Sequence, residues 1–354
     1  MKFIEETINK IGGANQDARA IAMGRLNQLV MPHWALGRLM DLAADLAAMT
    51  GSQNPPVSRK TVCVFAGDHG VTAEGVSQYP KEVTAQMILG FLGGHAGVNA
   101  LAKLNDTRVI VIDAGVDSDL EHLGENENFR SKKIRKGTSN IACGPAMSQD
   151  EAVKSITTGI EIANEFADST DIFGTGDMGI GNTTPSTAII AALSGNPVEG
   201  LTGRGTGIDD ERLKMKIDIV KKALEVNKVD SSDGMDVLTK LGGFEIGGIT
   251  GLILGAAAQK KPVLIDGFIS TAGALVAKTI KPEVADYMIT SHQSVEPGHE
   301  LMLSQIGKPA LLNLNMRLGE GTGSVLAMNI VEAAAKVLTE VATFEEIGVS
   351  GADK

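Results

Sequence analysis

Short apolar runs and longer stretches of helical periodicity alternate along the chain. Residues 61–66 and 108–114 are nearly continuous apolar runs, which are typical of strands buried on both faces of a parallel sheet. Residues 171–174 lead from another short run into a glycine-rich turn. The remaining strand candidates are 262–266, 287–290 and 310–315. The pattern therefore predicts a sheet built from short, separate strands.

Apolar residues recur at helical spacing between these runs. A helix is expected to open at Asn182, because polar capping residues and Pro185 in the first turn favour a helix start there. Asp209 and Asp210 begin an amphipathic helix that continues to Glu225. The other predicted helices are 26–49, 83–104, 151–167 and 323–344.

Strands that alternate with helices predict a three-layer α/β/α fold with a mainly parallel, Rossmann-like sheet. Residues 1–55 and 325–354 are almost purely helical in pattern, and we expect them to pair as a small helical domain. Residues 56–324 would then form the α/β domain. No internal repeat or low-complexity linker separates the two parts.

Charge and cysteine content narrow the classes of function. The chain has 32 Lys and Arg against 43 Asp and Glu, a formal net charge of −11. Such a surface repels nucleic acids and acidic lipids, so we expect neither as a partner. Cys63 and Cys143 have no metal-ligand or CxxC spacing and fit free thiols. With no signal-peptide pattern and no apolar run of membrane-spanning length, a cytoplasmic globular protein is expected.

Candidate chemistry lies where the predicted strands end, because ligands of open α/β sheets bind at the carboxyl ends of the strands. Five polar segments follow predicted strands: 67–70, 174–184, 266–267, 291–294 and 317–323. The chain has 42 Gly, and many fall in these segments or in 203–207 and 242–255. We expect these glycines to let the backbone approach a ligand closely.

Two glycine-rich segments are candidate anion sites. Residues 174–184 offer a row of backbone N–H groups followed by a helix start, which can hold a phosphate or a carboxylate. Tight turn packing is the alternative explanation. Residues 203–207 precede a helix that bears Lys214 and Lys216. A lysine there would supply a point charge to a phosphate, unless it simply lies on a solvated helix face.

Glu320 is the most informative carboxylate, since it stands between two glycines after a predicted strand. Partial withdrawal from water would raise its pKa and suit it to general-base catalysis; an exposed turn residue is the alternative. The histidines show no metal-ligand spacing, and structural roles are expected for them. They include His69, His95, His292 and His299.

Six segments in order resemble one family: 64–87, 174–189, 203–210, 242–251, 263–275 and 317–324. Their sequences include VFAGDHG, GTGDMGIGNTTP, GRGTGIDD, GGFEIGGITG, VLIDGFISTAGAL and RLGEGTGS. Together they are similar to the nicotinate-nucleotide–dimethylbenzimidazole phosphoribosyltransferases, which make the lower-ligand nucleotide of cobalamin. The similarity runs from about Leu26 to the C-terminus.

The resemblance implies a reaction and its base. Glu320 corresponds to the family's catalytic base, which takes the N–H proton of the benzimidazole while the other ring nitrogen attacks C1′ of nicotinate mononucleotide. Nicotinate leaves with inversion at C1′, giving α-ribazole 5′-phosphate. Because nicotinate departs as a neutral pyridine nitrogen, no metal or other cofactor is expected.

The resemblance also implies substrate contacts within the α/β domain. The nucleotide would be bound by Gly174, Gly176, Asp177, Gly179, Asn182, Thr183, Lys216 and Ser294, and further substrate contacts are predicted at Gly203 and Ser291. The aromatic base would be bound by Ser77, Tyr79, Gln86 and Leu318. The implied partners are these small molecules and, as in the family, a second copy of the chain in a homodimer.

Two stretches depart from the family's pattern. Residue 177 is Asp where Glu is expected, which shortens the reach to the ribose hydroxyls by one methylene. Met31, Trp34 and Ala35 differ within a stretch that resembles the family's KPxGSLGxLE, which bears on the range of accepted bases.

Two other classes of function stay open on sequence alone. One is a nucleotide-binding regulatory module without turnover. The other is a metal-dependent hydrolase that uses Asp68, His69 and His95. Glu320 distinguishes the enzyme from the module, because a pure binder gains nothing from a carboxylate at the reacting carbon.

Overall fold

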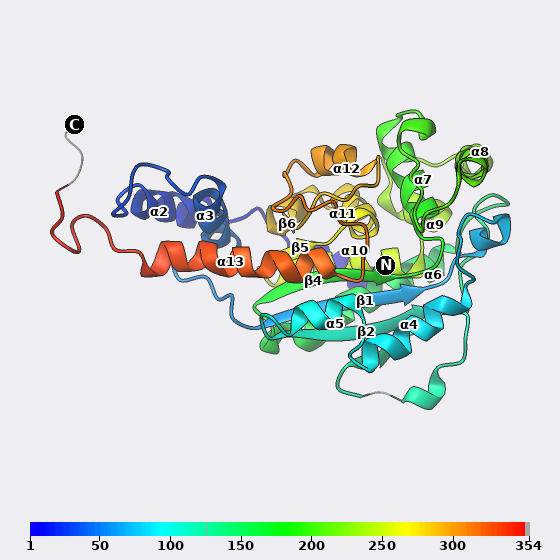
Figure 1. Cartoon of the computed structure of the whole chain (residues 1–354), viewed down its shortest axis with the longest axis horizontal. Coiled ribbons are helices and arrows are strands. Elements are labelled where there is room, and N and C mark those ends of the chain that lie inside the picture. The colour runs from blue at the N-terminus through cyan, green and yellow to red at the C-terminus, as the bar shows by residue number, and fades with distance from the viewer. Residues whose placement is uncertain (125, 351–354) are drawn as a thin grey trace.

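A six-stranded sheet organises the computed structural model, which describes residues 1–124 and 126–350. The strands lie in the order β3-β2-β1-β4-β5-β6, and every neighbouring pair is parallel (Figure 1). Their bounds are Lys60–Gly67 (β1), Thr107–Gly115 (β2), Phe129–Ser131 (β3), Ile172–Met178 (β4), Val263–Ile265 (β5) and Met288–Thr290 (β6). The predicted α/β fold class is confirmed.

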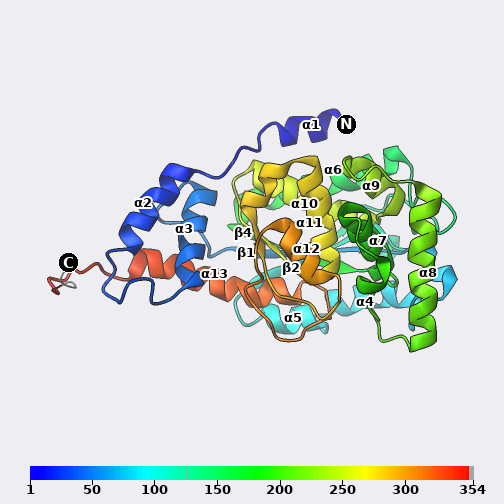
Figure 2. The same cartoon turned by 90° about the horizontal axis from the view of Figure 1, so that it is seen from above.

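Helices cover both faces of the sheet and give three layers (Figures 1 and 2). On one face lie α6 (Gln149–Phe166), α10 (Phe244–Ala258) and α11 (Phe268–Ile280), and on the other α4 (Glu82–Leu92), α5 (Gly97–Ala102) and α13 (Thr322–Glu340). The remaining helices are α1 (Lys2–Ile8), α2 (Gln16–Leu26), α3 (Arg38–Thr50), α7 (Thr183–Ser194), α8 (Asp210–Asn227), α9 (Gly234–Leu241) and α12 (His299–Ile306). None of the described helices is long and apolar enough to cross a membrane.

Helices α6 and α10 pack backbone to backbone, and glycine makes this possible. A Cβ on Gly251 would stand 1.9 Å from the carbonyl oxygen of Ile156, and one on Gly159 would stand 2.0 Å from that of Gly248. Within 242–255, the glycines of α10 therefore serve helix packing. The expectation that they bring backbone close to a ligand is wrong for this helix.

Several predicted elements have different bounds. The stretch 26–49 is not one helix, since α2 ends at Leu26 and α3 begins at Arg38. Gly93 and Gly94 divide the stretch 83–104 into α4 and α5, and Gly94 has a φ of +74°. Residues 310–315 form no strand, because Leu312 makes only an isolated bridge to His292.

Strand β4 runs further than predicted. It continues to Met178, so residues 174–178 are strand rather than turn. This extension carries Asp177 to the carboxyl edge of the sheet, where Figure 1 also shows α7 and α8.

The terminal segments meet beside the sheet. Helices α2 and α3 pack on α13, and Arg25 Nε donates to the carbonyl of Leu338 at 2.9 Å. We propose that these three helices form the predicted helical unit. Helix α1 instead packs on α6 and α10 of the body (Figure 2). Helix α13 spans both parts, since its first turns pack on β4 and β5 (Figure 1).

Candidate active site

A cleft of about 700 Å³ lies at the carboxyl edge of the sheet. Its walls come from residues after β4, β5 and β6, from the turn before α13, from α4 and from the loop at 205–206. The lining residues are Tyr79, Val83, Met87, Asp177, Met178, Gly179, Ile180, Asn182, Thr183, Gly205, Thr206, Gly267, Phe268, Ile269, His292, Ser294, Glu296, Arg317, Leu318, Gly319 and Glu320.

Eight of the predicted site residues meet in this cleft. They are Tyr79, Asp177, Gly179, Asn182, Thr183, Ser294, Leu318 and Glu320. They come from four segments that are far apart in the sequence. The fold therefore brings the predicted nucleotide and base segments to one place.

The other predicted residues lie outside the lining of the cleft. Ser77 lines a neighbouring pocket, Gln86 lies exposed on α4, and Ser291 is fully buried after β6. A Cβ on Gly174 would press on the side chains of Val62, Ser324 and Met328 at 2.8 to 3.0 Å.

Gly176 also packs closely against the backbone of the turn before α13. A Cβ there would stand 2.5 Å from the carbonyl oxygen of Glu320. The structure thus gives Gly174 and Gly176 a role in seating α13, where an anion cradle was predicted.

Glu320 projects into the cleft from a strained turn. Its φ is +62°, and Gly319 and Gly321 on either side also have positive φ. Glu320 is only 6% exposed, and Oε2 accepts a hydrogen bond from the amide of Val98 at 3.1 Å, in the first turn of α5. Burial raises the pKa of Glu320, against the lowering effect of the amides of Val98 and Gly97. The prediction of a desolvated carboxylate is confirmed.

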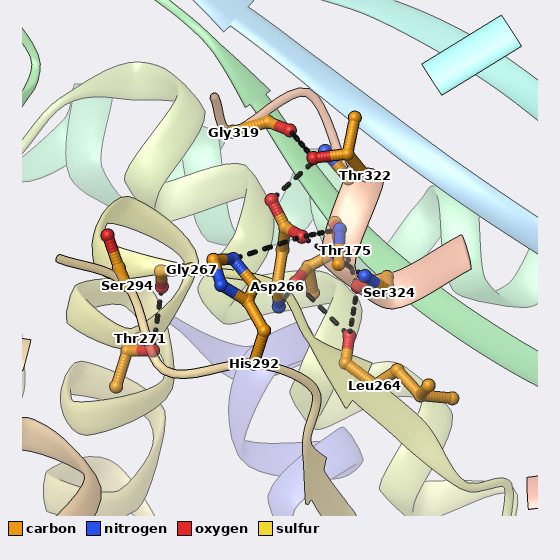
Figure 3. A network of polar contacts seen from close by, with 12 residues as sticks. Thr175, Leu264, Asp266, Gly267, Thr271, His292, Ser294, Gly319, Thr322 and Ser324 are labelled. Atoms are coloured by element: carbon orange, nitrogen blue, oxygen red, sulfur yellow. Dashed lines mark hydrogen bonds and ion pairs between the residues drawn. The ribbon is translucent and has the colours of Figure 1, made fainter. Parts of the chain in front are cut away.

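Asp266 holds the backbone of this turn. Its two carboxylate oxygens accept hydrogen bonds from the amides of Gly321, Gly323 and Ser324 at 3.1, 2.7 and 3.1 Å (Figure 3). Burial raises the pKa of Asp266 to about 7, although these amides lower it. The Ser324 hydroxyl donates to the carbonyls of Thr175 and Leu264, which ties α13 to β4 and β5.

Asp177 lies at the end of β4 beneath the same turn. Its Oδ2 accepts a hydrogen bond from Asn182 Nδ2 at 2.9 Å, and its Oδ1 is buried without a hydrogen-bond partner in the described part of the chain. Burial and then the nearby charge of Asp266 raise the pKa of Asp177 to about 8. A buried carboxyl oxygen left without a partner in this way fits a polar ligand group in the cleft.

Lys216 lies just behind the cleft wall. It is fully buried on α8, and Nζ donates to Thr183 Oγ1 at 2.7 Å and to the carbonyl of Gly203 at 3.2 Å. Burial lowers its pKa to about 8, while the charge of Glu296 acts in the opposite direction. The solvated-face alternative is wrong for Lys216, whereas Lys214 is exposed.

Two histidines that were expected to be structural lie beside the cleft. His299 Nδ1 accepts from the amide of Ser294 at 2.8 Å, so its proton is on Nε2, which donates to Thr271 Oγ1 at 2.9 Å. Burial lowers the pKa of His299 to about 3, which keeps it neutral. His292 lines the cleft next to Gly267, and its Nε2 is 3.9 Å from Asp266 Oδ1 (Figure 3).

The residues of the metal hypothesis have other partners. His69 Nε2 bonds to Glu245 Oε1 at 2.7 Å, and Asp68 accepts from the Thr84 hydroxyl and the amide of Asp117. Across residues 1–124 and 126–350, no three Asp, Glu, His or Cys side chains group as metal ligands. The geometry therefore gives the hydrolase alternative no support.

Comparison with known proteins decides the family. A model described as phosphoribosyltransferase matches residues 11–349. A nicotinate-nucleotide–dimethylbenzimidazole phosphoribosyltransferase of Syntrophotalea carbinolica is 53% identical over 350 residues, 99% of each chain. The protein of the same name from Desulfotalea psychrophila is 53% identical over 355 residues, which cover 100% of each chain. The chain belongs to the nicotinate-nucleotide–dimethylbenzimidazole phosphoribosyltransferase family.

A solved structure of this family has the same fold. The crystal structure of CobT from Thermus thermophilus superposes with a TM-score of 0.91 at 43% identity and covers 95% of this chain and 100% of that one. The family resemblance predicted from the six segments is thus confirmed.

Sequence reasoning missed several residues that line the phosphoribosyltransferase cleft. The apolar ones include Val83, Met87, Met178, Ile180, Phe268 and Ile269, and the polar ones include Thr206, His292, Glu296 and Arg317. Arg317 and Met178 stand inside motifs that were recognised, next to residues that were chosen. Phe268 and Ile269 also stand inside a recognised segment, 263–275, but they begin a helix that was not predicted, so no contact was assigned to them.

Proposed function

We propose that the protein transfers phosphoribose from nicotinate mononucleotide to 5,6-dimethylbenzimidazole or a related azole, in cobalamin biosynthesis. The products are α-ribazole 5′-phosphate and nicotinate. The observation that carries this proposal is the buried carboxylate of Glu320, held on a left-handed turn at the wall of the cleft. The chain's membership of a family whose relatives bear that enzyme's name also supports it.

Glu320 is the proposed catalytic base. One azole nitrogen forms a bond to C1′ with its lone pair, and the bond from C1′ to the nicotinate nitrogen breaks, with its electron pair leaving on nicotinate. The proton on the other azole nitrogen passes to Glu320. A raised pKa makes this carboxylate a stronger base than an exposed glutamate.

The lining of the cleft suits both substrates. Tyr79, Val83, Met87 and Leu318 are aromatic or apolar, which suits a flat aromatic base. Asp177, Asn182, Thr183 and Ser294 are polar, which suits ribose and phosphate. Ser77, Gln86, Gly203 and Ser291 remain predicted contacts outside the lining, and Met31, Trp34 and Ala35 also lie outside it.

We further propose a cytoplasmic homodimer. Cys63 and Cys143 are free thiols, and Cys143 is exposed, which suits a reducing compartment. Twofold dimers are the commonest oligomers of soluble proteins, and the homodimer is also what the family resemblance implies. Light scattering after gel filtration measures the molecular mass in solution. A mass of two chains would support the dimer, and a mass of one chain would contradict it.

Release of nicotinate tests the function directly. The protein is incubated with nicotinate mononucleotide and 5,6-dimethylbenzimidazole, and nicotinate and the new riboside are separated by chromatography. Equal amounts of both products support transfer. Nicotinate without the riboside indicates hydrolysis, and neither product in the presence of nucleotide binding indicates a regulatory module; either result contradicts the proposal.

A further inference from the structure

Asp68 and His69 follow β1 in the sequence, and no step of the proposed reaction uses them. Both side chains are buried, and neither lines the cleft. Their surroundings include the four residues between β4 and α7, which we call the 179–182 loop. Three of the four residues of this loop line the cleft. The buried pair therefore lies one layer behind the site.

The hydroxyl of Thr84 links Asp68 to the loop. Thr84 is fully buried on α4, and its Oγ1 accepts a hydrogen bond from the amide of Ile180 at 3.2 Å. Because the amide can only donate, the hydroxyl gives its own proton to Asp68 Oδ1, 2.7 Å away. Asp68 Oδ2 accepts from the amide of Asp117 at 2.8 Å. The chain of hydrogen bonds thus has one direction, from the loop through Thr84 to Asp68.

This hydroxyl joins two segments that both line the cleft. Val83 and Met87 contribute apolar lining from α4, the helix that carries Thr84. The loop contributes Asn182, whose Nδ2 donates to Asp177 Oδ2 at 2.9 Å. The position of α4 relative to the polar pair therefore depends on the contact between Thr84 and the loop.

The end of β1 supports the loop from below. A Cβ on Gly179 would stand 2.4 Å from the carbonyl oxygen of Gly67 and 3.4 Å from His69 Nε2. His69 is itself held by its hydrogen bond to Glu245. Since β1 leaves the loop no room on this side, loss of the Thr84 contact is expected to move the loop away from β1.

We propose that Thr84, oriented by Asp68, is a positioning residue for phosphoribosyl transfer. It sets the distance between an azole held against α4 and a ribose held at Asp177 and Asn182. This rests on the proposed function, because it assigns those two substrates to the two segments. Bond formation requires the azole nitrogen and C1′ to lie about 3–3.5 Å apart. A small displacement of one segment therefore slows transfer more than it weakens the binding of either substrate alone.

Three variants change this contact in different ways. Thr84→Val removes the hydroxyl and keeps the branched shape, and Thr84→Ser keeps the hydroxyl. Asp68→Asn leaves Thr84 in place, but the new amide group meets a donor where the wild type has an acceptor. Thr61→Val is the matched control, because Thr61 is buried near the start of β1, outside the cleft lining, and its hydroxyl bonds to that of Thr170 at 2.7 Å.

The rate of a single turnover is compared with the Kd of each substrate measured alone. Thr84→Val is expected to lower the rate by about 10- to 100-fold and to change the Kd of nicotinate mononucleotide and of 5,6-dimethylbenzimidazole by less than about threefold. Asp68→Asn should change the rate in the same direction, Thr84→Ser should recover most of it, and Thr61→Val should react like wild type. Hydrogen exchange of the Ile180 amide, measured without substrates, should become faster in Thr84→Val alone of the two valine variants.

Several results would overturn the positioning role. They are wild-type rates in Thr84→Val and Asp68→Asn, an equal loss of rate in Thr61→Val, and weaker substrate binding that accounts for the whole loss of rate. A wild type that yields no riboside contradicts the proposed function instead. A wild type that yields it, with unchanged rates in both Thr84→Val and Asp68→Asn, contradicts the positioning role alone.

Discussion

Asp266 fixes the backbone on which Glu320 stands. The carboxylate of Asp266 accepts the amide protons of residues 321, 323 and 324, directly after the base, at 2.7 to 3.1 Å. These amides would otherwise lack partners at the start of α13. The position of Glu320, the proposed base, thus depends on a residue that directly follows strand β5.

Substitution of Asp266 should therefore affect both stability and turnover. Asp266→Asn replaces an ionisable double acceptor by an amide, so buried amide protons lose a partner. We expect a loss of about 1–3 kcal/mol in the free energy of unfolding and at least about a tenfold lower kcat. Urea denaturation and steady-state kinetics measure the two effects.

Asp113→Asn is the matched control for this prediction. Asp113 is also fully buried, accepts from the amide of Val116 at 3.0 Å and lies at the end of β2, outside the cleft lining. The Asp113→Asn variant should be less stable than wild type and should keep the wild-type kcat. Equal loss of kcat in both variants would show that Asp266 has no positioning role.

Glu320→Gln should remove the base and keep the shape of the side chain. We expect kcat to fall by about 10²- to 10⁴-fold, with the Kd of nicotinate mononucleotide changed less than about twofold. Glu340→Gln, at the exposed far end of α13, should behave like wild type. Rapid-quench assays and calorimetry measure the two quantities. Wild-type turnover in the Gln variant would refute the assignment.

Asp177 should make the protein less stable as the pH rises. Its folded-state pKa of about 8 lies above the ordinary 3.8, so the folded state keeps a proton that the unfolded state loses from about pH 4 upward. Stability from this group is therefore present at low pH and lost as the pH rises toward 8. Asp266, with a pKa of about 7, acts with the same sign.

Asp177→Asn should flatten this decline. Urea midpoints measured from pH 5 to 8 would show a smaller loss of stability in the variant than in wild type. Asp119→Asn is the control, because Asp119 is exposed and paired with Lys136, and its lowered pKa confines its effect to acid pH. A decline as steep in Asp177→Asn as in wild type would contradict the buried, protonated state.

Gly176→Ala should displace the turn of Glu320. The added Cβ would stand 2.5 Å from the Glu320 carbonyl oxygen, so α13 or β4 must move. We expect about 1–3 kcal/mol of destabilisation and at least about tenfold slower turnover. Gly24→Ala is the control: Gly24 lies inside α2 with open space at its Cβ, and the change should stabilise by about 0.5–1 kcal/mol. Equal kcat in wild type and Gly176→Ala would contradict the packing role.

The sequence predicts the local features well, because they depend on neighbouring residues. The run at 61–66 became β1, and Glu320 between two glycines became a buried carboxylate. The end of β4 was missed because glycine is a poor strand former, and only the approach of α13 explains Gly174 and Gly176 there. Those contacts join residues far apart in the sequence.

Long-range contacts also explain what the local pattern does not predict about the site. Lys216 has the pattern of a surface lysine, but it is buried where α8 meets Thr183 of α7 and the loop at 203–207. The Asp266 side chain has partners that are 55 to 58 residues away in the chain. Helical spacing in 26–49 was overridden by a turn in which Trp34 has a φ of +53°.

Helix α13 connects the turn of Glu320 with helices α2 and α3. Its 19 residues begin two positions after the base and extend about 28 Å to the helices at the chain's two ends. No residue of α2 or α3 lines the cleft, yet both helices pack on α13, so a displacement of these helices is expected to reach the turn of Glu320 through α13. Binding of another molecule to α2 and α3 is therefore expected to alter the position of Glu320 without any contact to the cleft.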